Sequence, residues 1–180
     1  TTSVLGYYVA LGSSVPSNPH ARVCVEDGLK GLKAQLFGWS DSNGGWLEAP
    51  HYAMVSYDAI LGSLLMAHNA GLSDLIYDPQ MKKVISWFSK WSTPKDSRFQ
   101  GFRHLPPVGN TYISEPSGEF GIVARIWKDK DPEFASNMQW MFRQQHSWQF
   151  PGIGGAYATM AGYRKLLVDA DIPEKQPQYQ

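Results

Sequence analysis

Apolar residues recur along much of the chain at the three- and four-residue spacing of amphipathic helices. One such case is the segment 20–37, in which the apolar positions are Val25, Leu29, Leu32 and Leu36. The short apolar and aromatic segment 4–11 is typical of the end of a helix. The longer apolar segment 55–70 predicts a helix that ends at Gly71, because glycine is favoured just after a helix C-terminus.

Two aspartate–proline pairs predict further helix starts. Asp78-Pro79 and Asp131-Pro132 each combine a capping side chain with a proline, which is well tolerated at the first helical position. Apolar stripes follow both pairs, and the first stripe ends before Pro94. A last helix is predicted over residues 153–168.

About six helices, joined by loops of unequal length, predict an all-α fold of stacked antiparallel helical hairpins. Strand-like alternation is limited to a short stretch near Tyr112-Ile113. With 180 residues, of which 43% are hydrophobic, the chain is long enough for one domain with a substantial core. Residues 172–180 are rich in proline and glutamine, a composition typical of a linker.

Charge and cysteine content narrow the classes of partner and cofactor. The chain has 16 basic and 16 acidic residues, so its net charge of zero gives no electrostatic reason to expect nucleic acid or an anionic membrane as partner. No apolar run approaches the roughly 18 residues of a membrane span. Cys24 is the single cysteine, and the five histidines form no HExxH motif. We therefore predict no metal and no other cofactor.

Hydrogen-bonding side chains concentrate in two stretches. The first, GGWLEAPHY at residues 44–52, leads into the apolar helix, and the second, GFRHLPPVGNTY at residues 101–112, is followed by EPSGE at 115–119. A long loop with so many polar groups is costly to order, which indicates a function. Arg103 offers a planar fork for a carboxylate, and His104 can donate or accept a proton. In the alternative interpretation, Arg103 pairs with a glutamate and His104 caps a backbone carbonyl.

The seven tryptophans are numerous for a chain of this length. Four of them are expected at helix ends or in loops, where flat aromatic faces suit the apolar faces of sugar rings; these are Trp39, Trp46, Trp127 and Trp148. Trp87 and Trp91 lie on an apolar stripe and are expected in the core.

The stretch 44–52 resembles the GGxxxEGPxY motif of the heparinase II/III-like polysaccharide lyases and their alginate lyase relatives, although Ala49 and His51 stand where that family more often has glycine. The resemblance implies that residues 1–171 form the C-terminal part of an incomplete (α/α) toroid, and that residues 172–180 link it to an absent β-sandwich. It also implies a periplasmic or secreted location. The expected partners are an acidic polysaccharide or oligosaccharide and the remainder of the parent chain.

The same resemblance implies β-elimination of a uronic-acid-containing polysaccharide, with Tyr52 as base and acid and Tyr57 as the less favoured candidate. A free tyrosine has a pKa of about 10, so a cationic neighbour has to promote its ionisation. Arg103 and His104 are the nearest candidates for that neighbour, and His104 is the one expected to be catalytic. The expected substrate-binding residues are Trp46, Glu48, His51, Arg103, Asn110 and Glu115. Because the family's carboxylate-neutralising Asn or His lies upstream of the motif, at or before Thr1 here, a piece that lacks it is expected to be inactive alone.

Two other functions stay open. One is a glycoside hydrolase of the same toroid type, which would use Glu48, Glu115 or Glu119 as general acid and base. The other is a non-catalytic carbohydrate-binding helical domain. Elimination leaves an unsaturated product that absorbs in the ultraviolet and hydrolysis does not, so an ultraviolet assay separates these two, whereas a binding domain would show no turnover that Tyr52→Phe could abolish.

Overall fold

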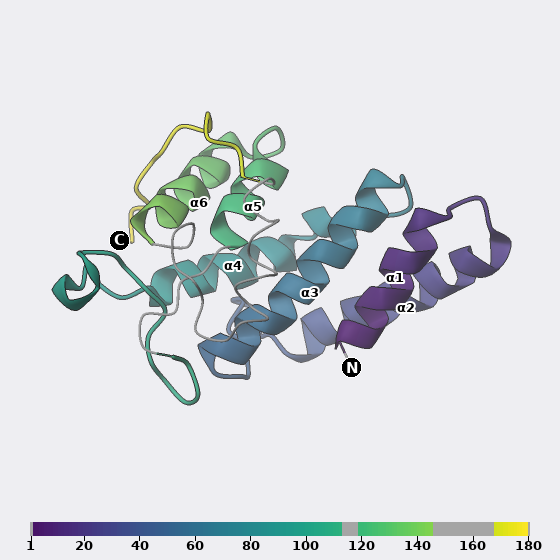
Figure 1. Ribbon diagram of the computed structural model, residues 1–180, viewed down its shortest axis with the longest axis horizontal. Coiled ribbons are helices and arrows are strands. Elements are labelled where there is room, and N and C mark those ends of the chain that lie inside the picture. The colour runs from purple at the N-terminus through teal and green to yellow at the C-terminus, as the bar shows by residue number, and fades with distance from the viewer. Residues whose placement is uncertain (1, 113–118, 146–167, 180) are drawn as a thin grey trace. The chain divides into compact units, whose positions relative to one another are not determined.

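The computed structural model describes residues 2–112, 119–145 and 168–179. Helices make up the regular structure of these residues (Figure 1), and strand-type pairing within them is limited to three isolated bridges, which confirms the all-α class. The described elements are α1 (Thr2–Ser14), α2 (Pro19–Gly38), α3 (Pro50–Asn69), the 3₁₀ turn η1 (Leu75–Tyr77), α4 (Pro79–Trp91), the 3₁₀ turn η2 (Ser97–Phe99), α5 (Glu119–Trp127) and α6 (Pro132–Gln144).

Aspartate side chains cap two of these helices as the sequence predicts. The Asp78 carboxylate accepts a hydrogen bond from the backbone N–H of Gln80 at 2.9 Å, immediately before α4. The Asp131 carboxylate accepts one from the N–H of Phe134 at 3.1 Å, at the start of α6. Each cap satisfies a donor that a helix N-terminus otherwise leaves without an intrahelical partner.

Other parts of the prediction differ from the structure. Helix α3 begins at Pro50 and not near residue 55, so the polar end of the first stretch is the first turn of the helix. Helix α5 was not expected at all, and Trp91 is exposed although its stripe predicted burial. Tyr112 lies outside any strand, and Ile113 is not among the described residues. The predicted helix 153–168 also falls outside the described residues, except for its last position.

The chain divides into two compact units. Unit 1 consists of residues 1–48 and 52–87, and unit 2 of residues 49–51 and 88–180. In unit 1, α1 lies beside α2 (Figure 1), and small residues allow the two backbones to approach closely. A Cβ atom at Gly12 would lie 2.7 Å from the carbonyl oxygen of Ala21.

Helices α3 and α4 contribute much of the core of unit 1. Tyr57 of α3 is almost completely buried, and its hydroxyl donates a hydrogen bond to the Met81 carbonyl at 3.1 Å. The other fully buried large side chains of this unit are Leu32, Leu36, Ile60, Leu64, Ile76, Met81 and Ile85. Because the buried phenol has an acceptor, Tyr57 packs without leaving an unsatisfied donor.

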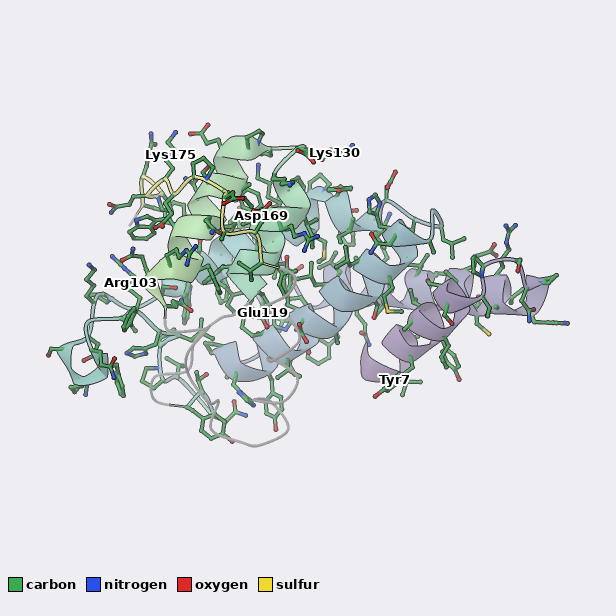
Figure 2. All side chains as sticks on the ribbon, turned by 45° about the horizontal axis from the view of Figure 1, so that its top comes forward. Tyr7, Arg103, Glu119, Lys130, Asp169 and Lys175 are labelled. Carbon is green, nitrogen blue, oxygen red and sulfur yellow. The ribbon has the colours of Figure 1, made fainter. Side chains whose placement is uncertain are left out.

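Unit 2 is built on α5 and α6, with the C-terminal segment laid over them. The rings of Trp127 and Phe134 meet edge to face at 5.5 Å. The backbone N–H of Lys175 donates to the Ser136 carbonyl at 3.1 Å, and Figure 2 shows Lys175 and Asp169 beside α6. The described residues of the predicted linker are therefore packed on this unit.

Within the described residues, no helix is both long and apolar enough to cross a membrane.

Candidate functional site

The glycines of the first polar stretch form a tight turn in unit 1. Gly44 has a φ of +89°, and a Cβ atom at this position would lie 2.3 Å from the Lys83 carbonyl oxygen. Only glycine satisfies both requirements without strain. The Asp41 carboxylate closes the turn by accepting hydrogen bonds from the N–H groups of Asn43 and Gly45, both at 2.8 Å.

Helix α4 holds this turn in place. The side-chain amide of Gln80 donates to the Ser40 hydroxyl and to the Asp41 carbonyl, each at 2.7 Å. The Lys83 ammonium donates to the Ser42 carbonyl at 2.9 Å. The turn thus has a fixed position on the scaffold of unit 1, and so does the chain that leaves it toward Glu48.

Glu48 is held by two side chains. The Trp46 indole Nε1 donates to Glu48 Oε2 at 3.2 Å, and the Ser56 hydroxyl donates to the same oxygen at 3.4 Å. Trp46 is only 7% exposed, so the expectation that its ring stacks on a sugar is wrong. Its ring packs in the core while its N–H orients the carboxylate. The exposed indole of this region is Trp39, whose carbonyl accepts the N–H of Leu47 at 3.0 Å.

Tyr52 stands on the first turn of α3 and is 53% exposed. Ser56, which holds Glu48, follows it by four residues and lies on the same face of the helix. The N-terminal turn of a helix favours negative charge, since its backbone N–H dipoles point outward there. Tyr52, and not the buried Tyr57, is therefore the tyrosine that can meet a substrate.

In unit 2 the tip of the second polar stretch contacts the turn that carries His51. The backbone N–H of His51 donates to the Thr111 hydroxyl at 3.1 Å, and the ring of His51 meets that of Tyr112 edge to face at 5.1 Å. A Cβ atom at Gly109 would lie 2.8 Å from the Ala49 side chain. Asn110 is exposed at this tip.

Arg103, expected to bind substrate, packs against α6 (Figure 2). Its guanidinium donates to the Thr93 carbonyl at 3.0 Å and lies over the Trp140 ring at 5.4 Å. Burial lowers the pKa of this guanidinium from its usual value. Arg103 therefore connects the loop to α6 through a cation–π contact.

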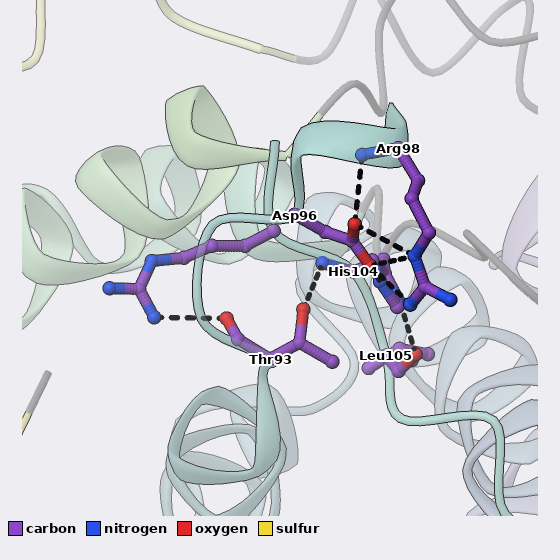
Figure 3. A network of polar contacts seen from close by, with 6 residues as sticks. Thr93, Asp96, Arg98, His104 and Leu105 are labelled. Atoms are coloured by element: carbon purple, nitrogen blue, oxygen red, sulfur yellow. Dashed lines mark hydrogen bonds and ion pairs between the residues drawn. The ribbon is translucent and has the colours of Figure 1, made fainter. Parts of the chain in front are cut away.

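His104 lies inside a polar network at the base of the same loop (Figure 3). It is 4% exposed; its Nδ1 donates to the Leu105 carbonyl at 2.8 Å and its Nε2 faces the Asp96 carboxylate at 3.3 Å. The Arg98 guanidinium, 2.7 Å from the same carboxylate, and the hydrogen bond from His104 hold the pKa of Asp96 well below its usual range. Such burial suits an anchor of the loop and does not suit proton transfer with a substrate.

The remaining predicted residues divide as follows. Glu119 is buried in the first turn of α5, and Trp127 is buried at the other end of that helix. Glu115 and Trp148 lie outside the described residues. The part of the chain that the structure describes contains no group of three or more His, Cys, Asp or Glu side chains placed to hold a metal ion.

Two site residues escaped the sequence reasoning. Ser56 was missed although it follows Tyr52 at the i+4 helical spacing, which is the signal that would have placed it beside that residue. Asp96 was missed because its partner His104 is eight residues away in an irregular loop, where no repeating pattern links two positions.

Comparison with known proteins gives no relative: no protein-family model, no curated protein and no solved structure matches the chain. The likeness of residues 44–52 to the lyase motif therefore stays a prediction from the residues themselves.

Proposed function

We propose that the protein is a polysaccharide lyase that cleaves a uronic-acid-containing polysaccharide by β-elimination, with Tyr52 as the residue that transfers protons. The observation that carries the proposal is in unit 1. An exposed phenol stands on the first turn of α3, one helical turn from the serine that fixes the carboxylate of Glu48. Reactive polar groups at the mouth of a rigid helix are typical of sites that act on substrates.

The chemistry requires few groups. The phenolate of Tyr52 takes the proton from C5 of the uronate, the electron pair forms the C4–C5 double bond, and the bond from C4 to the glycosidic oxygen breaks. The same phenol then returns the proton to the leaving oxygen. The step is eased by groups that stabilise negative charge on the substrate carboxylate, and the N-terminal turn of α3 offers its dipole for this purpose.

Glu48 and Trp39 have supporting roles in this proposal. The Glu48 carboxylate, oriented by Trp46 and Ser56, is suited to accept hydrogen bonds from sugar hydroxyls. The exposed indole of Trp39 offers a stacking face for a neighbouring sugar ring. His104 is not included as a catalytic residue, because its ring is buried and both of its nitrogens face acceptors.

The proposal also includes the fold of the chain, its location and further substrate contacts. An (α/α) toroid fold of antiparallel hairpins over residues 1–171 agrees with the all-α class. A periplasmic or secreted location fits an enzyme that acts on an extracellular polysaccharide. Substrate contacts from His51, Arg103, Asn110 and Glu115 stay predictions from the sequence.

An ultraviolet assay of the full-length protein against a panel of uronate polymers, such as alginate and polygalacturonate, tests the proposal. Elimination is expected to give a product that absorbs in the ultraviolet, together with shortened chains. New reducing ends without that absorbance would instead indicate hydrolysis, and binding without any cleavage would indicate a non-catalytic module. Either of these two results contradicts the lyase assignment.

A further inference from the structure

Helix α1 carries a large exposed apolar face. The opposite side of α1 is packed in unit 1: a Cβ atom at Gly6 would meet Ser63 of α3, and one at Gly28 of α2 would meet Val9. The exposed side presents five large apolar residues that are between 48% and 68% exposed, namely Val4, Tyr7, Tyr8, Leu11 and Val15. Figure 2 shows Tyr7 on the outer side of this helix. An apolar patch of this extent matches the largest patch of a typical monomeric protein, and such patches are often functional.

The spacing of this face matches a helix-packing seam. Val4, Tyr8, Leu11 and Val15 are separated by four, three and four residues, which is the a/d spacing by which one helix packs along another. Val15 immediately follows the last residue of α1 and extends the seam by one position. A seam of this kind fits a second helix better than it fits an irregular segment or a flat surface.

The same spacing is symmetric about its own midpoint. Read from either end, it gives four, three and four, so a second α1 running in the opposite direction presents the same pattern. In that antiparallel arrangement Val4 lies opposite Val15 of the second helix, and Tyr8 lies opposite Leu11. A pattern that is complementary to itself under a two-fold rotation is what an isologous dimer requires.

Charge and area support the same partner. Residues 2–14 contain no acidic or basic side chain, so the face carries no charge with which to select an acidic or basic protein. At about 200 Å² for a whole tyrosine, the exposed parts of the five side chains amount to roughly 500 Å² in each copy. Two copies together would bury about 1,000 Å², which reaches the lower limit of a specific interface.

We propose that this face of α1 is the interface of a two-fold symmetric homodimer, in which two antiparallel α1 helices pack along the seam Val4, Tyr8, Leu11 and Val15. Failure of this interface would appear as a monomeric chain and failure of the lyase assignment as absent elimination, so the two outcomes are distinguishable.

Sedimentation analysis of the full chain and of charge variants tests the proposal. The wild-type chain is expected to approach twice its mass of 20.1 kDa at roughly 100 µM, a concentration at which even weak interfaces associate. Tyr8→Glu and Leu11→Lys should each weaken association by about tenfold or more, since each places two charges against apolar side chains. Val23→Lys is the matched control: Val23 is similarly exposed, but on α2, and this variant should dimerise like wild type.

Mixing the two charge variants tests the antiparallel register. In the mixed dimer the carboxylate at position 8 of one copy faces the ammonium at position 11 of the other, so the mixture should regain a dimer that neither variant forms alone. Circular dichroism checks that both variants stay helical. A monomeric wild-type chain overturns the proposal, and so does a mixture of folded variants that stays monomeric, or a control that dissociates as the seam variants do.

Discussion

The ring of His51 meets the ring of Tyr112 edge to face, with their centroids 5.1 Å apart and their planes at 84°. The backbone N–H of His51 also donates to the hydroxyl of Thr111. Both contacts lie within unit 2, which contains residues 49–51 as well as the second polar stretch. Two residues at the tip of that stretch therefore hold His51, which precedes them by about 60 positions in the chain.

The contact between Thr111 and His51 should contribute measurably to stability. Thr111→Val removes the acceptor while keeping the shape of the side chain, and should lower the free energy of unfolding by about 1 kcal/mol. Thr111→Ser keeps the hydroxyl and serves as the matched control, with a smaller effect. Urea titrations of the three proteins give the comparison, and equal losses for Val and Ser would contradict a role for the hydrogen bond.

Gly44 should be intolerant of any side chain. Its φ is positive, and the Lys83 carbonyl oxygen lies 2.3 Å from the point that a Cβ atom would occupy. Gly44→Ala should therefore lower the free energy of unfolding by about 2 kcal/mol or more. Gly62→Ala is the control, because nothing lies within 4 Å of that position in helix α3, and it should raise stability by about 0.5–1 kcal/mol. Thermal unfolding of both variants tests whether the two changes in stability have opposite signs.

The pH dependence of stability should report on Asp96. Arg98 and His104 lower the pKa of this carboxyl in the folded protein. The charged carboxylate therefore stabilises the fold at pH values above its ordinary pKa of 3.8, and this stabilisation is lost as the pH falls below that value. Asp96→Asn should therefore be less stable than wild type at pH 7, and the difference should shrink as the pH falls below about 4.

Arg98→Gln tests the cause of that shift. Arg98 makes the largest contribution to lowering the pKa of Asp96, so this variant should reproduce much of the loss at pH 7. Because Arg98 is well exposed, added salt should reduce the difference from wild type. A difference between Asp96→Asn and wild type that stays constant from pH 7 to the acid range would argue against the network.

Local signals in the sequence predicted much of the fold. The aspartate caps at Asp78 and Asp131 act on residues two or three positions away, and the apolar stripe of α2 repeats from Val25 to Leu36. Helix α5 was missed because its nine residues show too few turns for a repeating pattern. Sequence patterns are thus sufficient where the cause of a structure is local or periodic.

The site depends on contacts between distant residues, which such patterns do not reveal. Trp39 and Trp46 look equally suited to sugar stacking, and packing alone makes the first exposed and the second buried. The requirement for glycine at position 44 comes from a carbonyl on α4, far along the chain. His104 has the residue type of a catalytic base, but the Asp96 carboxylate and the Leu105 carbonyl make it an anchor.

The central claim is that Tyr52 transfers the proton in an elimination reaction, and Tyr52→Phe in the full-length protein tests it most directly. The variant keeps the ring and the helix, and should lower kcat by about 100-fold or more with little change in KM. Tyr179→Phe is the matched control, since it removes a phenol hydroxyl that meets Ser89 in unit 2, and it should keep its activity. A Tyr52→Phe protein that forms the unsaturated product at nearly the wild-type rate would contradict the assignment.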